Sequence, residues 1–143
     1  MNNKWDRRFI ELAYLVSSWS KDPSTQCGAV VTRNNRIVSV GFNGFPTGTP
    51  DTEEHLNNRE IKDKKVIHAE VNAILFARQD LTDCTIYTVP IPPCSRCASI
   101  IIQSGIKRIV SVKPTPDKLE RWGDDFQLAT DMYLHADISY KYV

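Results

Sequence analysis

The chain has 143 residues, a formal net charge of +1, 41% hydrophobic residues, 24% charged residues and four cysteines. These values are typical of an ordinary globular protein, and the length predicts one domain over residues 1–143. The small net charge argues against a nucleic-acid partner. Four cysteines fit a reducing compartment. Because no apolar signal core or bilayer-length span is present, we expect a cytoplasmic protein without membrane association.

The first third of the chain predicts a helix, a hairpin and a loop. Apolar residues recur at threes and fours over Trp5–Trp19, which indicates a helix. Gln26–Thr32 and Ile37–Gly41 are predicted antiparallel strands, joined by a turn at 33–36. The following segment, 41–50, is dense in glycine and proline. It is either a plain connection or, because it lies just past a strand end, a loop that faces a ligand.

The remainder of the chain alternates helices and strands. The most polar segment, Asp51–Lys65, is predicted to be an exposed excursion. A glycine between a later helix and strand, Gly105, favours a right-handed β-α-β crossover with parallel strands. The chain is therefore predicted to be an α/β protein, a three-layer α/β/α domain with a mixed five-stranded sheet. The elements expected here are a helix from His68 through Arg78, a strand over Cys84–Val89, a helix from Pro93 to Gly105, a strand over Lys107–Val112, a helix over Lys118–Tyr133 and a final strand over Asp137–Val143.

Two short motifs, His68-Ala69-Glu70 and Pro93-Cys94-Ser95-Arg96-Cys97, carry the chemistry. One imidazole and two thiols bind zinc in three of its four tetrahedral positions and leave the fourth for water, as in catalytic sites. The carboxylate of Glu70 supplies a proton carrier. Residues two apart in a helix point in nearly opposite directions, so His68 and Glu70 can serve one metal only at a helix start. The combined pattern is typical of zinc-dependent nucleobase deaminases.

The alternative to a catalytic zinc is a closed, structural zinc site. It would need a fourth ligand, and closed sites usually take paired cysteine or histidine spacings. None of the candidates has such a pair, so the sequence favours one open zinc site per chain. A disulfide or redox role for Cys94 and Cys97 would leave Glu70 unexplained. The candidate fourth ligands are Cys27, Cys84, His55 and His135.

Over nearly its whole length the chain resembles the deoxycytidylate (dCMP) deaminases of the cytidine deaminase-like superfamily. Residues 21–26 are similar to the K-D-P-x-x-Q segment of that family, and 41–48 to its G-[YFW]-N-G-x-P-x-G loop. Residues 68–74 and 93–98, continued by 101–106, resemble its two zinc helices. The segment after the fourth predicted strand departs from the family pattern because it lacks a tyrosine, and Trp122 is the nearest aromatic candidate to replace it.

The resemblance implies hydrolytic deamination of dCMP to dUMP and ammonia, a step that feeds dTMP synthesis. It implies zinc on His68, Cys94 and Cys97, and proton transfer by Glu70. The backbone N–H of Ala69 would bind the pyrimidine O2, and Asn43 would bind the sugar hydroxyl. For the 5′-phosphate, the candidates are Lys21, Ser24 and Thr25, which are also explained as residues that end a helix and form a turn.

The resemblance also implies regulation in a homo-hexamer that dCTP activates and dTTP inhibits. Glycines in the 41–48 loop can present N–H groups to a triphosphate, which Mg²⁺ would accompany. A nucleic-acid-editing deaminase is an alternative class, but the low net charge argues against it. A non-catalytic binding module is another, but it would not need Glu70, which is not a zinc ligand. The predicted effector residues are Asn43, Gly44, Phe45 and Gly48.

Overall fold

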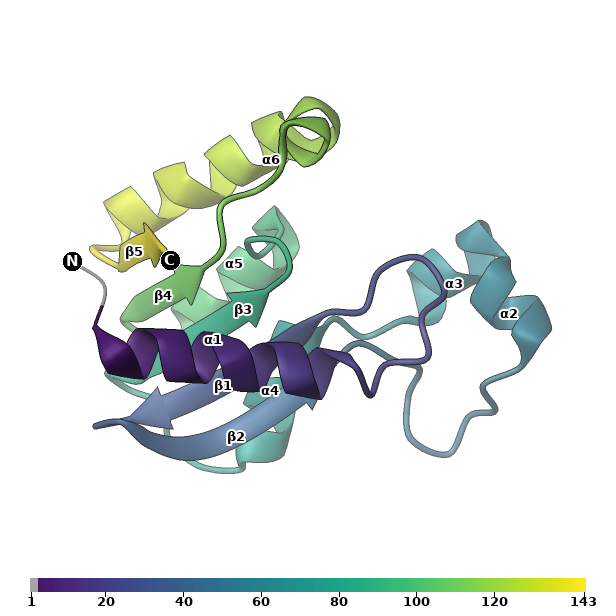
Figure 1. The fold of residues 1–143 in the computed structure, drawn as a ribbon, viewed down its shortest axis with the longest axis horizontal. Helices are drawn as coiled ribbons and strands as arrows, with labels where there is room; N and C mark the ends of the chain where they lie inside the picture. The colour runs from purple at the N-terminus through teal and green to yellow at the C-terminus, as the bar shows by residue number, and fades with distance from the viewer. Residues whose placement is uncertain (1–2) are drawn as a thin grey trace.

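The computed structural model describes residues 3–143, which form one mixed sheet with helices on both faces (Figure 1). The elements are α1 (Lys4–Ser17), β1 (Gly28–Arg33), β2 (Arg36–Phe42), α2 (Glu53–Asn57), α3 (Arg59–Lys65), α4 (Ala69–Ala77), β3 (Thr85–Val89), α5 (Ser95–Gln103), β4 (Arg108–Ser111), α6 (Pro116–His135) and β5 (Ser139–Tyr142). The strand order is β2-β1-β3-β4-β5. Strand β1 pairs antiparallel with β2 and β3, whereas β3–β4 and β4–β5 are parallel. The predicted fold class is confirmed.

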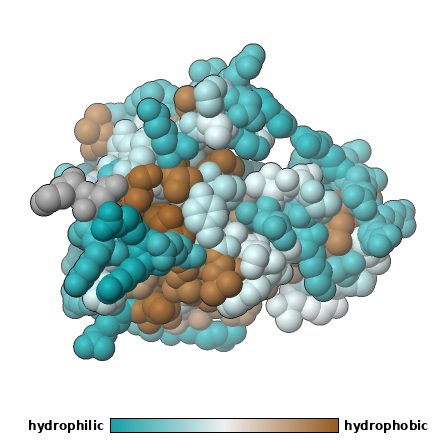
Figure 2. All heavy atoms as spheres, viewed as in Figure 1, coloured by the Kyte–Doolittle hydropathy of each residue, from teal (hydrophilic) through white to brown (hydrophobic). Residues whose placement is uncertain are grey.

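Alternate strand residues face two apolar layers, as the pleat requires. On one face, α1 packs through Phe9 and Ala13 against Val30 and Tyr87. On the other face, α4, α5 and α6 cover the inward residues of the same strands, including Val31. Figure 2 shows apolar atoms gathered beside α1, while the projection formed by α2 and α3 is mainly hydrophilic. No helix within residues 3–143 is long and apolar enough to cross a membrane.

The start of α4 lies directly against β2, and a glycine makes this contact possible. A Cβ atom on Gly41 would lie 2.4 Å from the backbone nitrogen of Ala73 and 2.5 Å from the carbonyl oxygen of Ala69. Real Cβ atoms do not approach backbone so closely, so any side chain here would push α4 outward. Gly41 therefore fixes how near the first turn of α4 comes to the sheet.

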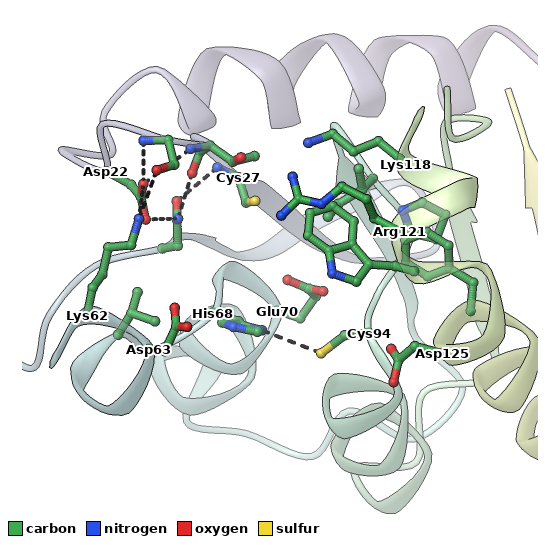
Figure 3. Close-up of a pocket in the computed structure, with 18 of the residues that line it drawn as sticks. Asp22, Cys27, Lys62, Asp63, His68, Glu70, Cys94, Lys118, Arg121 and Asp125 are labelled. Atoms are coloured by element: carbon green, nitrogen blue, oxygen red, sulfur yellow. Dashed lines mark hydrogen bonds and ion pairs between the residues drawn. The ribbon is translucent and has the colours of Figure 1, made fainter. Parts of the chain in front are cut away.

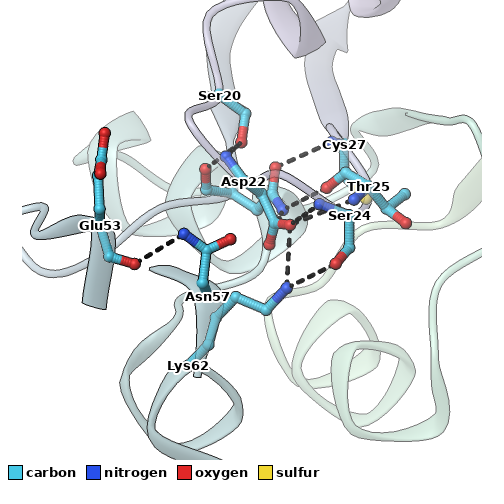
Figure 4. Close-up of polar contacts among 9 residues, drawn as sticks. Ser20, Asp22, Ser24, Thr25, Cys27, Glu53, Asn57 and Lys62 are labelled. Carbon is cyan, nitrogen blue, oxygen red and sulfur yellow. Dashed lines mark hydrogen bonds and ion pairs between the residues drawn. The ribbon is translucent and has the colours of Figure 1, made fainter. Parts of the chain in front are cut away.

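The polar segment over 51–65 is more ordered than an exposed excursion. It forms α2 and α3, whose N-caps Thr52 and Asn58 each accept a hydrogen bond from the backbone N–H group three residues further along. Its residue Lys62 is buried, with Nζ 3.1 Å from Oδ1 of Asp22 and 3.1 Å from Oγ of Ser24 (Figure 4). Most of the segment is exposed, as predicted, but its buried ion pair was not anticipated, because a polar pattern does not reveal one.

The predicted bounds of α1 and α6 differ from those observed by two residues, at the C-terminal end of α1 and at both ends of α6. Helix α1 ends at Ser17 rather than at Trp19, which is exposed beyond it. Helix α6 begins at Pro116 and is longer than predicted at both ends. Proline suits the first position of a helix, because its missing N–H would have no helical partner there.

Candidate active site

A cavity of about 390 Å³ opens between the starts of α4 and α5, the 22–27 segment, α3 and α6 (Figure 3). Its wall includes His68, Glu70 and Cys94. Figure 3 shows Glu70 beside His68 and Cys94, with Lys62 on one side of the cavity and side chains of α6 on the other. The two sequence motifs therefore meet in one pocket.

The three predicted zinc ligands lie together at two helix starts. His68 and Cys94 occupy the N-cap positions of α4 and α5, and neither side chain makes a cap hydrogen bond. The Nδ1 of His68 lies 3.2 Å from Sγ of Cys97 and 3.6 Å from Sγ of Cys94. Tetrahedral zinc with ordinary bond lengths needs nitrogen and sulfur about 3.5 Å apart, so this donor set fits the ion.

The donor set leaves an open position on the metal. Within residues 3–143, no fourth histidine, cysteine, aspartate or glutamate joins the cluster of His68, Cys94 and Cys97, whose ligand atoms lie within 4.8 Å of one another. Three protein ligands are the number found in catalytic zinc sites, whereas closed structural sites have four. The residues that stay outside the cluster include all four candidates for a closed site: Cys27, Cys84, His55 and His135.

Hydrogen bonds within the cluster shift the pKa values of the two thiols in opposite directions. Hydrogen bonds from Cys97 and from His68 lower the pKa of Cys94 to about 4, although burial opposes the shift. The pKa of Cys97 is raised, first because its thiol donates to Cys94 and then because it is buried. Binding of a divalent cation displaces protons from thiol ligands.

Glu70 is buried in the cavity and is not part of the ligand cluster. Burial raises the pKa of its carboxyl group, because the charged form loses hydration. A raised pKa makes a carboxylate a stronger base. Glu70 lies in the same cavity as His68 and Cys94, so the structure brings together the residues of both motifs.

The loop residues predicted to contact substrate have different positions. Ser24, Thr25 and Asn43 line the cavity. The Oδ1 of Asn43 accepts from the Cys27 N–H at 2.9 Å, and its Nδ2 donates to the Thr25 carbonyl oxygen at 2.9 Å. Lys21 does not line this cavity, and its Nζ lies 2.9 Å from Oδ2 of Asp51.

Helix α6 supplies a wall that sequence reasoning largely missed. The ring of Trp122 lies 4.9 Å from Nζ of Lys118 and 4.5 Å from Cζ of Arg121. Only Trp122 was anticipated, as an aromatic substitute. The spacing of the others by three and four residues places them on one helix face, but the sequence does not show that this face meets the cavity. The α6 residues in the wall are Lys118, Arg121, Trp122, Asp125 and Phe126.

A second cavity of about 230 Å³ adjoins the first and shares Asp22 and Asn43 with it. Three of the four predicted effector residues line it, and Gly48 does not. The aromatic side chains in its wall are Trp19, Phe42 and Phe45, and the charged ones are Lys21, Asp22 and Asp51.

Comparison with known proteins identifies the family. Residues 3–113 match the family described as the cytidine and deoxycytidylate deaminase zinc-binding region. An uncharacterised deaminase of Aliivibrio fischeri is 51% identical over 138 residues, which are 96% of this chain and 92% of that protein. A probable deoxycytidylate deaminase of Caenorhabditis elegans is 39% identical over 98% of this chain and 70% of its own length.

The fold has a close counterpart among solved structures. The dCMP deaminase of cyanophage S-TIM5, in complex with dCMP and dUMP, aligns with a TM-score of 0.77 and 21% identity, covering 100% of this chain and 99% of that one. At this identity the likeness supports the fold alone.

The chain belongs to the cytidine and deoxycytidylate deaminase family, and the resemblance seen in its sequence is confirmed. It is an enzyme of the hydrolytic deaminase class. The match ends at residue 113, so the α6 wall lies outside the matched region.

Proposed function

We propose that this protein hydrolyses dCMP to dUMP and ammonia. The observation that carries the proposal is the buried carboxylate of Glu70 beside an open His68, Cys94 and Cys97 donor set inside a cavity. Relatives named deoxycytidylate deaminase, among them the human protein at 40% identity, support dCMP over free cytidine.

The reaction adds water across the N3–C4 double bond of the pyrimidine and expels the C4 amino group as ammonia. Zinc, when bound, acts as a Lewis acid that lowers the pKa of water. Glu70 takes one proton from the attacking water and delivers it to N3. It then takes the remaining proton of the hydroxyl group on C4 and passes it to the amine, which leaves as ammonia when the C4–N bond breaks and the C4 carbonyl forms. The start of α4 lacks a side-chain cap, so the Ala69 N–H is available to the pyrimidine O2. The Oδ1 of Asn43 retains a second lone pair for a sugar hydroxyl.

The 5′-phosphate needs cations that are not already neutralised. Lys62 is paired with Asp22, and Lys21 with Asp51, outside the cavity. Within residues 3–143, three cations that line the cavity make no ion pair: Arg59, Lys118 and Arg121. Lys118 and Arg121 lie together against the ring of Trp122. We therefore place the phosphate near Lys118 and Arg121, with the hydroxyl groups of the 24–25 loop as further donors.

Ammonia release from a panel of substrates tests this proposal. The panel contains dCMP, deoxycytidine, CMP and a short single-stranded oligodeoxynucleotide. We expect dCMP to be preferred over deoxycytidine by several orders of magnitude in kcat/KM, because a site built for a charged group leaves its donors unpaired without it. Equal turnover of the two would assign the protein to the free-nucleoside branch, and preference for the oligonucleotide would assign it to nucleic-acid editing.

We further propose that dCTP activates and dTTP inhibits a homo-hexamer through the second cavity. Its aromatic wall suits a base, and Asn43 is common to both cavities, so occupancy of one alters the wall of the other. Mg²⁺ would accompany the triphosphate, because this ion usually binds through phosphates and one or two carboxylates, and Asp51 lines the second cavity.

The dependence of the rate on dCMP concentration tests this regulation. A sigmoidal dependence that becomes hyperbolic when dCTP is added supports it. Hyperbolic kinetics unaltered by either triphosphate, in protein shown to be oligomeric, would contradict it.

A further inference from the structure

The helix that carries both thiols begins without a cap of its own. Cys94 is the N-cap residue of α5, but its Sγ lies with His68 and makes no cap hydrogen bond. The first N–H groups of a helix need acceptors, which an N-cap side chain ordinarily supplies. In α5 that side chain is reserved for the metal site, so an acceptor has to come from elsewhere.

The acceptor comes from α6. Oδ2 of Asp125 accepts the backbone N–H of Ser95 at 2.8 Å, and Oδ1 accepts the Ser95 hydroxyl at 2.6 Å. Ser95 is the first residue of α5 and lies between the N-cap Cys94 and the second thiol at Cys97. Hydrogen bonds to an ionised carboxylate are about twice as strong as neutral ones, and a negative charge is favourable at a helix N-terminus.

The same carboxylate connects the thiols to the substrate wall. Lys118, Arg121, Trp122 and Asp125 are spaced by three and four residues, share one face of α6 and line the large cavity. In Figure 3, Asp125 lies next to Cys94, while Lys118 and Arg121 extend further into the cavity. The Asp125–Ser95 contact therefore sets where the face of α6 lies relative to the metal ligands.

We propose that Asp125 is a positioning residue that fixes the first turn of α5, and with it Cys94 and Cys97, in zinc-binding geometry. The inference rests on the proposed function for the identity of the metal site. A residue that only docks α6 onto α5 would stabilise the fold equally with and without zinc. A positioning residue also changes the affinity for the ion.

Zinc affinity, measured by competition with a chromogenic chelator on the full chain, distinguishes these roles. We expect Asp125→Ala to bind zinc about 10- to 100-fold more weakly, as loss of such supporting hydrogen bonds does in other zinc sites. We expect Asp125→Asn to lose much less, because an amide can accept from the Ser95 N–H and donate to its hydroxyl. The neighbouring Asp124→Asn makes the same charge change at an exposed position and should match the wild type. Cobalt in place of zinc should show an altered thiolate-to-metal absorption band in Asp125→Ala only.

Wild-type zinc affinity and an unchanged cobalt spectrum in Asp125→Ala would overturn the proposal. If that variant does not fold, the zinc affinity of Ser95→Ala tests the proposal instead, because this change removes one of the two hydrogen bonds to Asp125. A smaller but measurable loss of zinc affinity supports the positioning role, and wild-type affinity overturns it. Zinc affinity is independent of turnover, so a wild type that binds zinc but releases no ammonia from dCMP would contradict the proposed function and leave this result standing.

Discussion

The Nζ of Lys62 lies 3.1 Å from Oδ1 of Asp22, and the two side chains are only 9% and 10% exposed. The same Oδ1 accepts the backbone N–H groups of Ser24 and Thr25 (Figure 4). Asp22 thus connects α3 to the loop that lines the cavity. Because Asn43 donates to the Thr25 carbonyl oxygen, the position of this loop also bears on the proposed sugar-binding residue.

Replacing Lys62 with methionine should lower the free energy of unfolding by about 3 kcal/mol, since it leaves a buried carboxylate without its cation. Urea unfolding measures this loss, and KM for dCMP should rise with it as the loop loosens. Lys64→Met is the matched control, because Lys64 forms an exposed pair with Glu60 and should change stability by less than about 1 kcal/mol. A Lys62→Met protein with wild-type stability and KM would show that the Lys62–Asp22 pair does not hold the loop in place.

Glu70→Gln should separate chemistry from structure. The amide keeps the shape of the side chain but cannot carry protons, so activity on dCMP should fall on the order of 10²- to 10⁴-fold or more. Zinc content and the thermal unfolding midpoint should stay close to those of the wild type, because Glu70 lies outside the ligand cluster. Activity comparable to the wild type would remove Glu70 from the mechanism.

Metal content offers an independent check. We expect about one zinc per chain by metal analysis, from the three ligands and one open position. Cys94→Ala and Cys97→Ala should lose zinc and stability together, because metal binding is coupled to folding. Chelation of the wild type should lower its thermal midpoint likewise. Two tightly bound zinc ions per chain would show a second site that the ligand count misses.

The metal cluster was predictable because its geometry is local. The requirement that His68 and Glu70 serve one metal only at a helix start is met, since His68 is the N-cap of α4. The same holds for Cys94 in α5. The parallel pairing of β3 with β4 followed from Gly105, whose φ of +91° permits the short connection into β4. Short-range rules were sufficient for these features.

The rest of the cavity depends on contacts across the chain. Nothing in the local pattern says which face α6 turns to the metal, so Lys118, Arg121 and Asp125 could not be assigned by spacing alone. Likewise, the pairing of Lys62 with Asp22 spans 40 residues, so the local pattern of the polar segment does not reveal it. Tertiary packing, not propensity, selects these partners.

Gly41→Ala should destabilise the protein and reduce activity. The added Cβ would meet the backbone of Ala69 and Ala73, which can yield only if α4 moves, at a cost of about 3 kcal/mol. Gly123→Ala is the matched control: it lies within α6, nothing lies within 4 Å of its added Cβ, and alanine there should stabilise by up to about 1 kcal/mol. Equal stability of the two variants by urea unfolding would show that α4 tolerates displacement.

The stability of the protein in acid depends on Asp6, in α1. Its side chain is 1% exposed, and it accepts hydrogen bonds from Arg108, Lys141 and Tyr87. Burial alone would raise the pKa of Asp6, but these hydrogen bonds outweigh it and lower the pKa from 3.8 to about 2. The unfolded chain therefore binds this proton more readily than the folded one.

A lowered pKa in the folded state makes the Asp6 contribution to stability fully present above pH 3.8 and lost as the pH falls toward 2. Asp6→Asn should accordingly be less stable than the wild type at pH 7, and the difference should shrink between pH 4 and pH 2. Urea unfolding across this range measures it, and taking the difference between the two proteins cancels loss of metal in acid. Glu60→Gln, at an exposed position, should follow the wild type throughout. A difference between wild type and Asp6→Asn that does not vary with pH would mean that Asp6 titrates alike in both states.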